Sequence, residues 1–134
     1  MRRRARERMT KILLVETDPL QAFLRMSVLE RRFPDVERVA DAAEALCLVE
    51  QPGFAQSLRL VVCGPHLSGF GRAEFVTELH ARLPQLPILV LGTSVETAAD
   101  YVADCIEFLP RPTATEEMMV AVGRMLALGE LRTA

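Results

Sequence analysis

The spacing of apolar residues changes repeatedly along the chain from Lys11 onward. Short continuous apolar runs are typical of strands buried on both faces of a parallel sheet. They alternate with segments in which apolar residues recur every three or four positions, as they do on one face of a helix. This alternation predicts a single α/β domain: a doubly wound, five-stranded parallel sheet with five helices on its two faces. The predicted strands cover residues 11–16, 37–40, 58–63, 87–91 and 105–109.

Capping signals mark the starts of the predicted helices. Asp18 and Pro19 combine an N-cap acid with a proline at the first helical position. Residues 41–44 and 113–116 have the spacing of a capping box. Residues 93–101 begin with possible caps but have weak periodicity, which predicts only a short helix. The buried face predicted for the first helix consists of Leu20, Phe23, Leu24 and Val28.

Length and composition indicate one stand-alone domain. The chain has 134 residues, half of them apolar and a quarter charged, which is enough to form a core. No apolar run is long enough to cross a membrane, and no secretory signal is recognisable, so we expect a cytoplasmic protein. The three cysteines fit no metal-binding spacing and are expected to be reduced thiols. They are Cys47, Cys63 and Cys105.

The first residues differ in charge from the rest. Five arginines and one acid occupy positions 2–8, whereas the remainder of the chain is acidic. An acidic body repels nucleic acid, so no nucleic-acid partner is expected. We expect residues 1–9 to be a basic, disordered extension, with either Met1 or Met9 as the true start. Residues 10–130 would form the domain, and residues 131–134 a tail.

Ligands of doubly wound sheets bind at the carboxyl ends of the strands. Three sequence features at these ends resemble the response-regulator receiver family (the CheY-like, flavodoxin-like fold). Residues 12–19 are similar to its strand ending in an acidic cluster, and residues 67–70 to its loop after strand three. Residues 108–112 are similar to its aromatic-x-x-Lys-Pro ending, in which the peptide before the proline is usually cis. The resemblance covers residues 11–128 and implies a bacterial two-component signalling protein, with Phe108 at the position of the family's switch aromatic.

The resemblance also implies a reaction. The family transfers a phosphoryl group to an aspartate at the end of strand three, using magnesium held by acids, a hydroxyl and a lysine. The nucleophile position is Gly64, which has no side chain, and no acid lies between Glu50 and Glu74. A degenerate phosphorylation site, as in a pseudo-receiver, is therefore predicted. The acidic cluster keeps Glu16 and Asp18 but has Thr17 between them. The hydroxyl position is Gly92, with Thr93 one residue later, and the lysine position is Arg111.

This pattern predicts a non-enzymatic signalling module that acts by phosphorylation-independent protein–protein interaction. The expected partner is a histidine kinase or a downstream effector, and no cofactor or metal is expected. By analogy with the family, the partner would bind through helix 4, strand 5 and helix 5. A homodimer through this face is possible, although only the family's acid is present, at Glu107. The predicted face contains Thr97, Tyr101, Glu107, Met118, Ala121 and Arg124.

Other interpretations remain open. The strand-end pocket would suit a sensor of small anions or nucleotides with Arg111 as the anion clamp, and an enzyme of unrecognised chemistry is a third possibility. Cys63 and His66 are conceivable as nucleophile and base, but a thiol in a buried strand is inert. Glu16, Asp18 and His66 are conceivable metal ligands, which Arg111 would oppose. We expect a direct salt bridge from Arg111 to Glu16 or Asp18.

Overall fold

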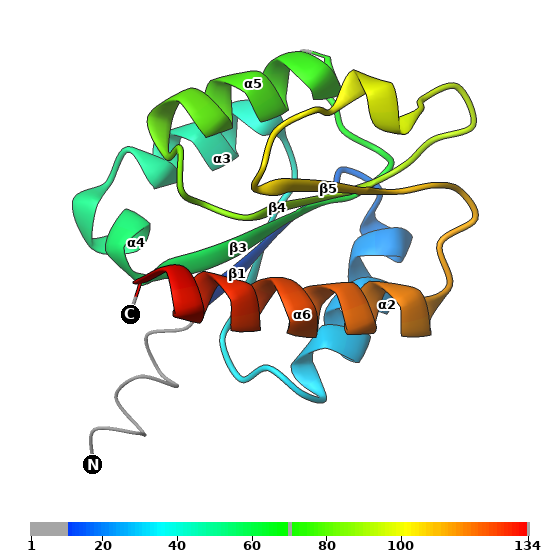
Figure 1. Ribbon diagram of the computed structural model, residues 1–134. Coiled ribbons are helices and arrows are strands. Elements are labelled where there is room, and N and C mark those ends of the chain that lie inside the picture. The colour runs from blue at the N-terminus through cyan, green and yellow to red at the C-terminus, as the bar shows by residue number, and fades with distance from the viewer. Residues whose placement is uncertain (1–10, 70, 134) are drawn as a thin grey trace.

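Five parallel strands form one sheet at the centre of the protein in a computed structural model, which describes residues 11–69 and 71–133 (Figure 1). The spatial order is β2-β1-β3-β4-β5, as in flavodoxin-like sheets. The predicted fold class is therefore confirmed. The extension predicted at residues 1–9 lies outside the described residues. The strands are β1 (Lys11–Val15), β2 (Val36–Val39), β3 (Leu58–Cys63), β4 (Ile88–Leu91) and β5 (Ile106–Leu109).

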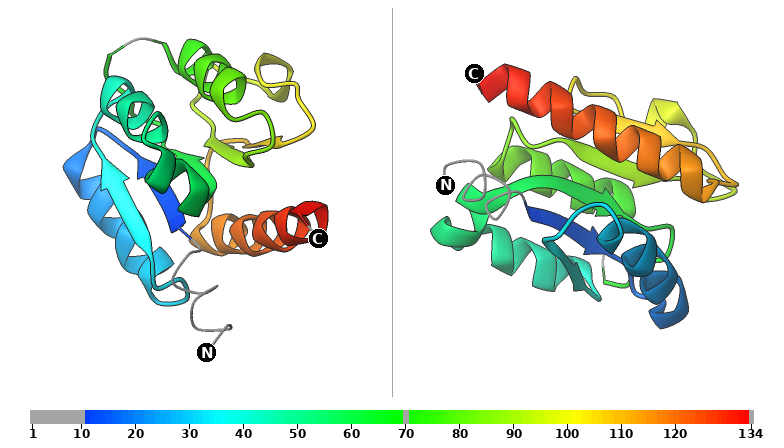
Figure 2. Two further views of the ribbon diagram at one scale, coloured as in Figure 1. Left: turned by 90° about the vertical axis from the view of Figure 1, so that its left-hand side faces the viewer. Right: turned by 90° about the horizontal axis from the view of Figure 1, so that it is seen from below.

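Helices cover both faces of the sheet (Figures 1 and 2). One face packs against α2 and α6 through a cluster that includes Ile12, Leu14 and Val122. The other face packs against α3 and α5 through a cluster that includes Leu13 and Phe75. Alternate residues of β1 thus point to opposite cores, which explains why its sequence is apolar throughout. The helices are α2 (Pro19–Glu30), α3 (Ala42–Val49), α4 (Pro52–Ser57), α5 (Arg72–Arg82) and α6 (Thr115–Thr133).

The ends of several elements follow the sequence signals. Asp18 caps α2 by accepting hydrogen bonds from the backbone N–H groups of Leu20 and Gln21, at 2.9 and 3.1 Å. Asp41 caps α3 through the N–H of Glu44, at 2.8 Å. At the other end of the chain, α6 continues to Thr133, into the tail predicted at residues 131–134.

The buried face predicted for α2 is wrong except at Val28, which is partly buried and packs against the core. Leu20, Phe23 and Leu24 have 63%, 67% and 49% of their surface exposed, whereas Ala22 and Leu29 are buried. Apolar residues occupy almost every side of this helix, so periodicity alone does not select the packed side. Ala22 and Leu29 lie on the side that faces the sheet, and Leu20, Phe23 and Leu24 lie on the outside.

The connection between β4 and β5 also differs from the prediction. Its only helical element is a 3-10 turn, η1 (Ala98–Asp100), capped by Thr97 rather than by the predicted residues 93 and 94. Val95 and Val102 in this connection are 86% and 83% exposed, so the segment has no apolar face that would hold an α-helix against the sheet. The fifth α-helix of the fold is instead α4, a short helix that directly precedes β3.

Candidate functional site

A completely buried acid, Glu16, directly follows β1 and lies beside the carboxyl end of β3. Its Oε2 accepts a hydrogen bond from the N–H of Asp18 at 2.8 Å, and its Oε1 accepts a longer one from the N–H of His66 at 3.5 Å. The guanidinium of Arg25, on α2, lies 3.7 Å from Oε1. A buried carboxylate needs such partners, and this set holds the side chain of Glu16 in one position.

That position lies directly beside Gly64. A β-carbon added to Gly64 would lie 2.3 Å from Oε1 and 3.0 Å from Cδ of Glu16. The carboxylate of Glu16 therefore occupies the space that any side chain at position 64 would enter. The two predicted site positions are brought together, and the acid fills the place that the glycine leaves open.

A second glycine at this edge is filled in the same manner. A β-carbon added to Gly92 would lie 2.5 Å from Cζ of Phe108 and 3.0 Å from the carbonyl oxygen of Leu109. The ring of Phe108 stacks on Tyr101, with 5.6 Å between ring centroids and 14° between planes. Phe108, at the position of the family's switch aromatic, thus packs over the strand end where the hydroxyl residue would stand.

Thr17 joins three loops. Its hydroxyl donates to the carbonyl oxygen of Ala40 at 2.5 Å and accepts from the N–H of Ser68 at 2.7 Å. Its own N–H donates to the carbonyl oxygen of His66 at 2.8 Å. Arg38 adds hydrogen bonds to the carbonyl oxygen of Glu16, at 2.7 and 3.0 Å. Thr17 therefore fastens the loop after β3 to the ends of β1 and β2.

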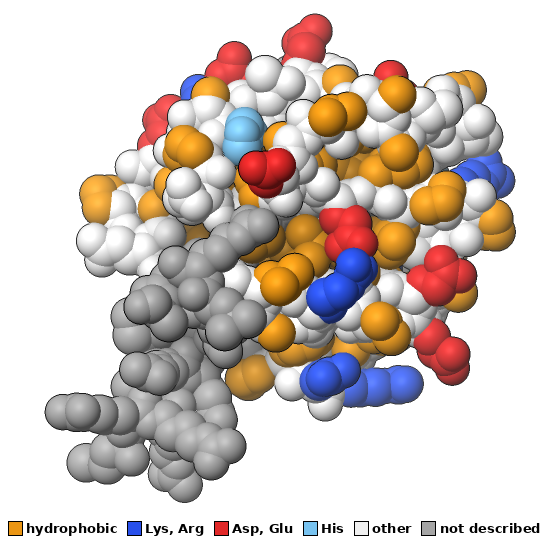
Figure 3. All heavy atoms as spheres, in the orientation of Figure 1, with side chains coloured by type: hydrophobic (Ala, Val, Ile, Leu, Met, Phe, Trp, Pro, Cys, Tyr) orange, Lys and Arg blue, Asp and Glu red, His pale blue; other side chains and the backbone are white. Residues whose placement is uncertain are grey.

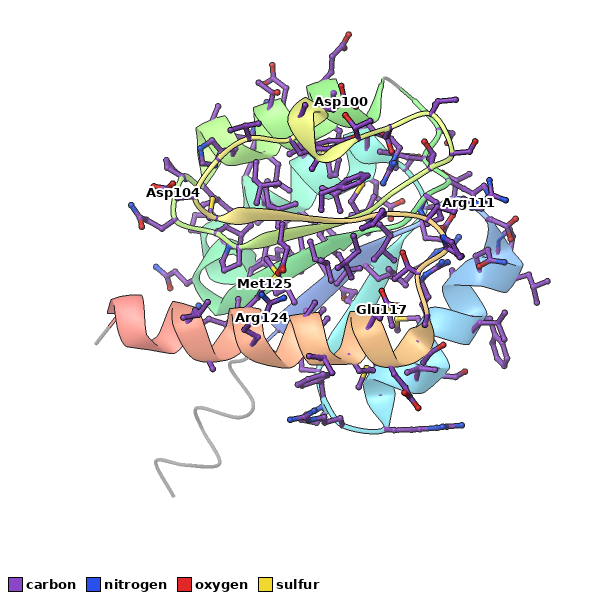
Figure 4. The ribbon with its side chains drawn as sticks, turned by 45° about the vertical axis from the view of Figure 1, so that its right-hand side comes forward. Asp100, Asp104, Arg111, Glu117, Arg124 and Met125 are labelled. Carbon is purple, nitrogen blue, oxygen red and sulfur yellow. The ribbon has the colours of Figure 1, made fainter. Side chains whose placement is uncertain are left out.

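The salt bridge predicted for Arg111 is wrong. Among the described residues no carboxylate forms an ion pair with Arg111, and Arg25 lies beside Glu16 instead. The carboxylate of Glu16 lies against Gly64 and Arg25, so the cation comes from α2. Arg111 lies on the exposed loop after β5 (Figure 4). The Arg111–Pro112 peptide is cis, as the family resemblance implies.

A buried polar network that the sequence did not reveal lies between α5 and the loop after β4. Arg72 pairs with Glu96, and it donates to the carbonyl oxygen of Leu91 at 2.5 Å. Glu96 also accepts hydrogen bonds from the hydroxyl of Tyr101 and, at 3.2 Å, from the N–H of Thr93. One signal was present, since an arginine at the start of a helix is disfavoured by the helix dipole and suggests a specific partner.

Burial shifts the pKa values of several groups at this edge. It raises the pKa of Cys63 to about 11, so the thiol stays protonated and is a poor nucleophile at neutral pH. Burial, together with the hydrogen bond to Glu96, also raises the pKa of Tyr101. Burial lowers the pKa of Arg25, an effect that the charge of Glu16 partly opposes.

Metal-binding and membrane-spanning features can be assessed for the described part of the chain. Within residues 11–69 and 71–133, no group of three or more His, Cys, Asp or Glu side chains is arranged to hold a metal ion. No helix in these ranges has the length and apolar character needed to cross a membrane.

No protein-family model matches the chain, and no curated protein matches it. Solved structures do match, and they are similar in fold at low sequence identity. A response regulator receiver protein from Sinorhizobium medicae is 19% identical, with a TM-score of 0.75, and the match covers 90% of this chain and 96% of that one. A CheY-like receiver domain protein from Methanospirillum hungatei is 18% identical, with a TM-score of 0.79 and coverages of 92% and 98%. A receiver domain protein from Clostridium thermocellum is 15% identical, with a TM-score of 0.80 and coverages of 91% and 98%. The chain therefore has the fold of CheY-like receiver domains.

Proposed function

We propose that this protein is a receiver-like signalling module that acts through protein–protein interaction without being phosphorylated in its strand-end pocket, and that it has no enzymatic activity. One observation carries the proposal: the carboxylate of Glu16 stands where a side chain at position 64 would begin, 2.3 Å from the added β-carbon. The family's phosphoryl transfer needs a carboxylate nucleophile at that place, and no Asp or Glu lies between Glu50 and Glu74.

The contacts of the remaining acids support the same proposal. Magnesium prefers several oxygen ligands in octahedral geometry. Glu16 is buried against Arg25, and Asp18 Oδ1 accepts the two hydrogen bonds that begin α2. A magnesium ion would have to displace Arg25 or break the helix cap. We therefore propose that the pocket takes no magnesium in solution.

Half of the six residues on the face that the family resemblance implies are buried within the fold. Tyr101, Met118 and Ala121 are buried, and Glu107 pairs within the chain with Arg124, which reaches from α6 towards β5 (Figure 4). On this side of the molecule hydrophobic side chains alternate with charged ones and form no continuous patch (Figure 3). On the predicted face, Thr97, Glu107 and Arg124 are the residues that a partner could contact.

Exposed apolar side chains offer two alternative surfaces, and such side chains are typical of interaction sites when they gather together. Val95 and Val102 project from the connection between β4 and β5. Leu20, Phe23 and Leu24 project from the first half of α2. The first set belongs to the loop that contains Glu96, and the second belongs to the helix that carries Arg25. A partner on either surface would therefore contact an element that is fixed by the strand-end residues.

The function is tested by partner capture from an extract of the source cells, with and without magnesium and acetyl phosphate. The proposal predicts that the same signalling protein, a histidine kinase or an effector, is recovered under both conditions. Val102→Asp and Phe23→Asp would show which surface binds, since each places a charge on one surface only. Capture that occurs only with the phosphodonor would contradict the proposal.

A further inference from the structure

The amino end of the sheet, opposite the Glu16 network, contains an apolar cavity of about 300 Å³. Leu58 at the start of β3 and Pro87 directly before β4 place it there, and α4 and the last turns of α6 contribute to its walls (Figure 1). Its volume is at the lower limit of the range of about 300–1,000 Å³ that is usual for small-molecule sites. The apolar side chains that line it belong to Ala55, Leu58, Leu83, Leu86, Pro87 and Leu126.

Much of this lining is fixed before any ligand binds. Leu58 and Leu86 are 3% and 7% exposed and belong to the core. Pro84 and Pro87 restrict the backbone of the loop between α5 and β4, and the N–H of Leu86 donates to the carbonyl oxygen of Leu83 at 3.1 Å in the same loop. A ligand that enters such a cavity does not have to order its walls.

One charged residue, Arg59 on β3, lies at this cavity, and no carboxylate of the described residues lines it. Nη1 of Arg59 donates to the carbonyl oxygens of Gln56 and Leu58, at 2.7 and 3.1 Å. Within residues 11–69 and 71–133, Nε and Nη2 have no hydrogen-bond partner, and the guanidinium forms no ion pair. The N–H groups on the Nε–Nη2 edge of a guanidinium form a fork that matches the two oxygens of a carboxylate. Because Arg59 is exposed, this fork is accessible to a ligand that projects from the cavity.

The volume of the cavity limits the size of the ligand. About 300 Å³ holds roughly ten groups of the size of a water molecule. A straight-chain or single-ring organic acid of about ten non-hydrogen atoms fills that space, whereas a helix of a partner protein is much larger.

We infer that this cavity binds a small amphipathic carboxylic acid, with its hydrocarbon body among the leucines and its carboxylate on the Nε–Nη2 edge of Arg59. Burial of the hydrocarbon body supplies most of the affinity. The guanidinium selects an acid over a neutral molecule with the same body. The site goes beyond the proposed function, since it lies at the other end of the sheet from the Glu16 network and requires no partner protein.

Calorimetric titration of the full chain with octanoate and with hydrocinnamate, a single-ring acid of similar size, tests the inference. Octanol has the same chain as octanoate without the charge, and acetate has the charge without the chain. We expect at least one of the two larger acids to bind with one-to-one stoichiometry, octanol to bind about fivefold or more weakly than octanoate, and acetate to give no signal. Absence of binding by both larger acids, or equal binding of octanoate and octanol, would overturn the inference.

Arg59→Gln should weaken binding of the acid by about fivefold or more and leave the binding of octanol unchanged. Ala55→Leu should weaken the binding of both by about tenfold or more, because the larger side chain fills the cavity from α4, and its melting temperature should not fall. Arg31→Gln is the matched control for the charge, because Arg31 is an exposed arginine at the end of α2, and it should bind as the wild type does.

Wild-type affinity for the acid in both Arg59→Gln and Ala55→Leu would overturn the inference. A dimer that sediments as such in the absence of acid and is abolished by Ala55→Leu would also overturn it, because a second copy of the chain would then be the occupant. These outcomes are separate from the proposed function, since partner capture is measured without added acid and should be retained in Arg59→Gln.

Discussion

Glu16 and Gly64 are steric complements: Oε1 of the buried acid lies 2.3 Å from the point where a β-carbon at position 64 would stand. Both belong to strand ends paired in the same sheet, since Val15 and Cys63, the residues before them, are register partners. Neither position can change without affecting the other. The absence of a nucleophile at position 64 is therefore coupled to the packing of Glu16, and restoring a side chain there would require Glu16 to move.

Gly64→Ala should destabilise the protein by about 1–3 kcal/mol, because the added methyl group overpacks a site whose neighbour is fixed by hydrogen bonds. In a Glu16→Ala background the same substitution should cost clearly less, with a coupling energy of about 1 kcal/mol or more. Urea denaturation of the four proteins measures this cycle.

Gly53→Ala is the matched control, because a β-carbon at Gly53 would have no atom within 4 Å. It should leave stability unchanged or slightly higher, since alanine is the better helix former in α4. Equal costs for Gly64→Ala in the two backgrounds would show that Glu16 is not the obstruction.

The network around Glu96 should contribute more to the free energy of unfolding than surface ion pairs do. Glu96→Gln removes the negative charge from a nearly buried Arg72, so we expect a loss of about 3–5 kcal/mol. Glu78→Gln, which breaks the exposed pair with Arg82, should cost less than about 1 kcal/mol. Thermal or urea unfolding compares the two variants. Similar losses in both would contradict a structural role for the Glu96 network.

Gly92→Ala should displace the ring of Phe108 from its stack on Tyr101, because the added methyl group would lie 2.5 Å from Cζ. The chain has one tyrosine and no tryptophan, so its intrinsic emission reports on Tyr101 alone. We expect a change in tyrosine emission and near-UV circular dichroism in Gly92→Ala. Gly71→Ala, where an added β-carbon meets nothing within 4 Å, should retain the wild-type spectrum. An unaltered spectrum in Gly92→Ala would show that Phe108 is not held by this contact.

The raised pKa of Cys63 predicts an alkaline loss of stability. The unfolded thiol loses its proton near pH 9, whereas the folded thiol keeps its proton to about pH 11. The unfolded state therefore binds fewer protons over this interval, and stability falls as pH rises from 9 to 11. At about 1.4 kcal/mol per pKa unit, the loss should approach about 3 kcal/mol.

Cys63→Ala should show a shallower decline over the same interval, although its stability at pH 7 is lower. Tyr101, whose pKa is also raised mainly by burial, contributes to both proteins at the upper end, slightly less in Cys63→Ala because the charge of Cys63 is a minor cause of its shift. Urea unfolding at intervals of half a pH unit gives the two curves. Parallel curves would mean that the Cys63 thiol titrates alike in the folded and unfolded states.

Most of the sheet could be predicted from the sequence because its strands are buried on both faces. Such strands form short, uninterrupted apolar runs, as in β1 and β3, and local capping acids mark the helix that follows β1. The packed side of α2 could not be predicted, because apolar residues occur around most of its circumference. The short helix predicted after β4 rested on possible caps at residues 93 and 94 and on weak periodicity, and the structure has only a 3-10 turn there, capped by Thr97.

The site positions were predictable and their partners were not. Family resemblance aligned Gly64, Gly92 and Arg111 through motifs next to them in the chain. The cation beside Glu16 comes instead from Arg25, which is separated from it by two turns of α2 and is brought close only when that helix packs on the sheet. Arg111, which the sequence suggested as a salt-bridge partner of these acids, lies instead on the exposed loop after β5.

The most direct test of the account is the intact mass of the protein after incubation with magnesium and acetyl phosphate, with a receiver domain that keeps its aspartate as the positive control. The account predicts phosphorylation of the control and an unchanged mass for this protein, because Glu16 and Gly64 leave no nucleophile at the end of β3. A stoichiometric gain of one phosphoryl group that is removed by hydroxylamine would contradict it.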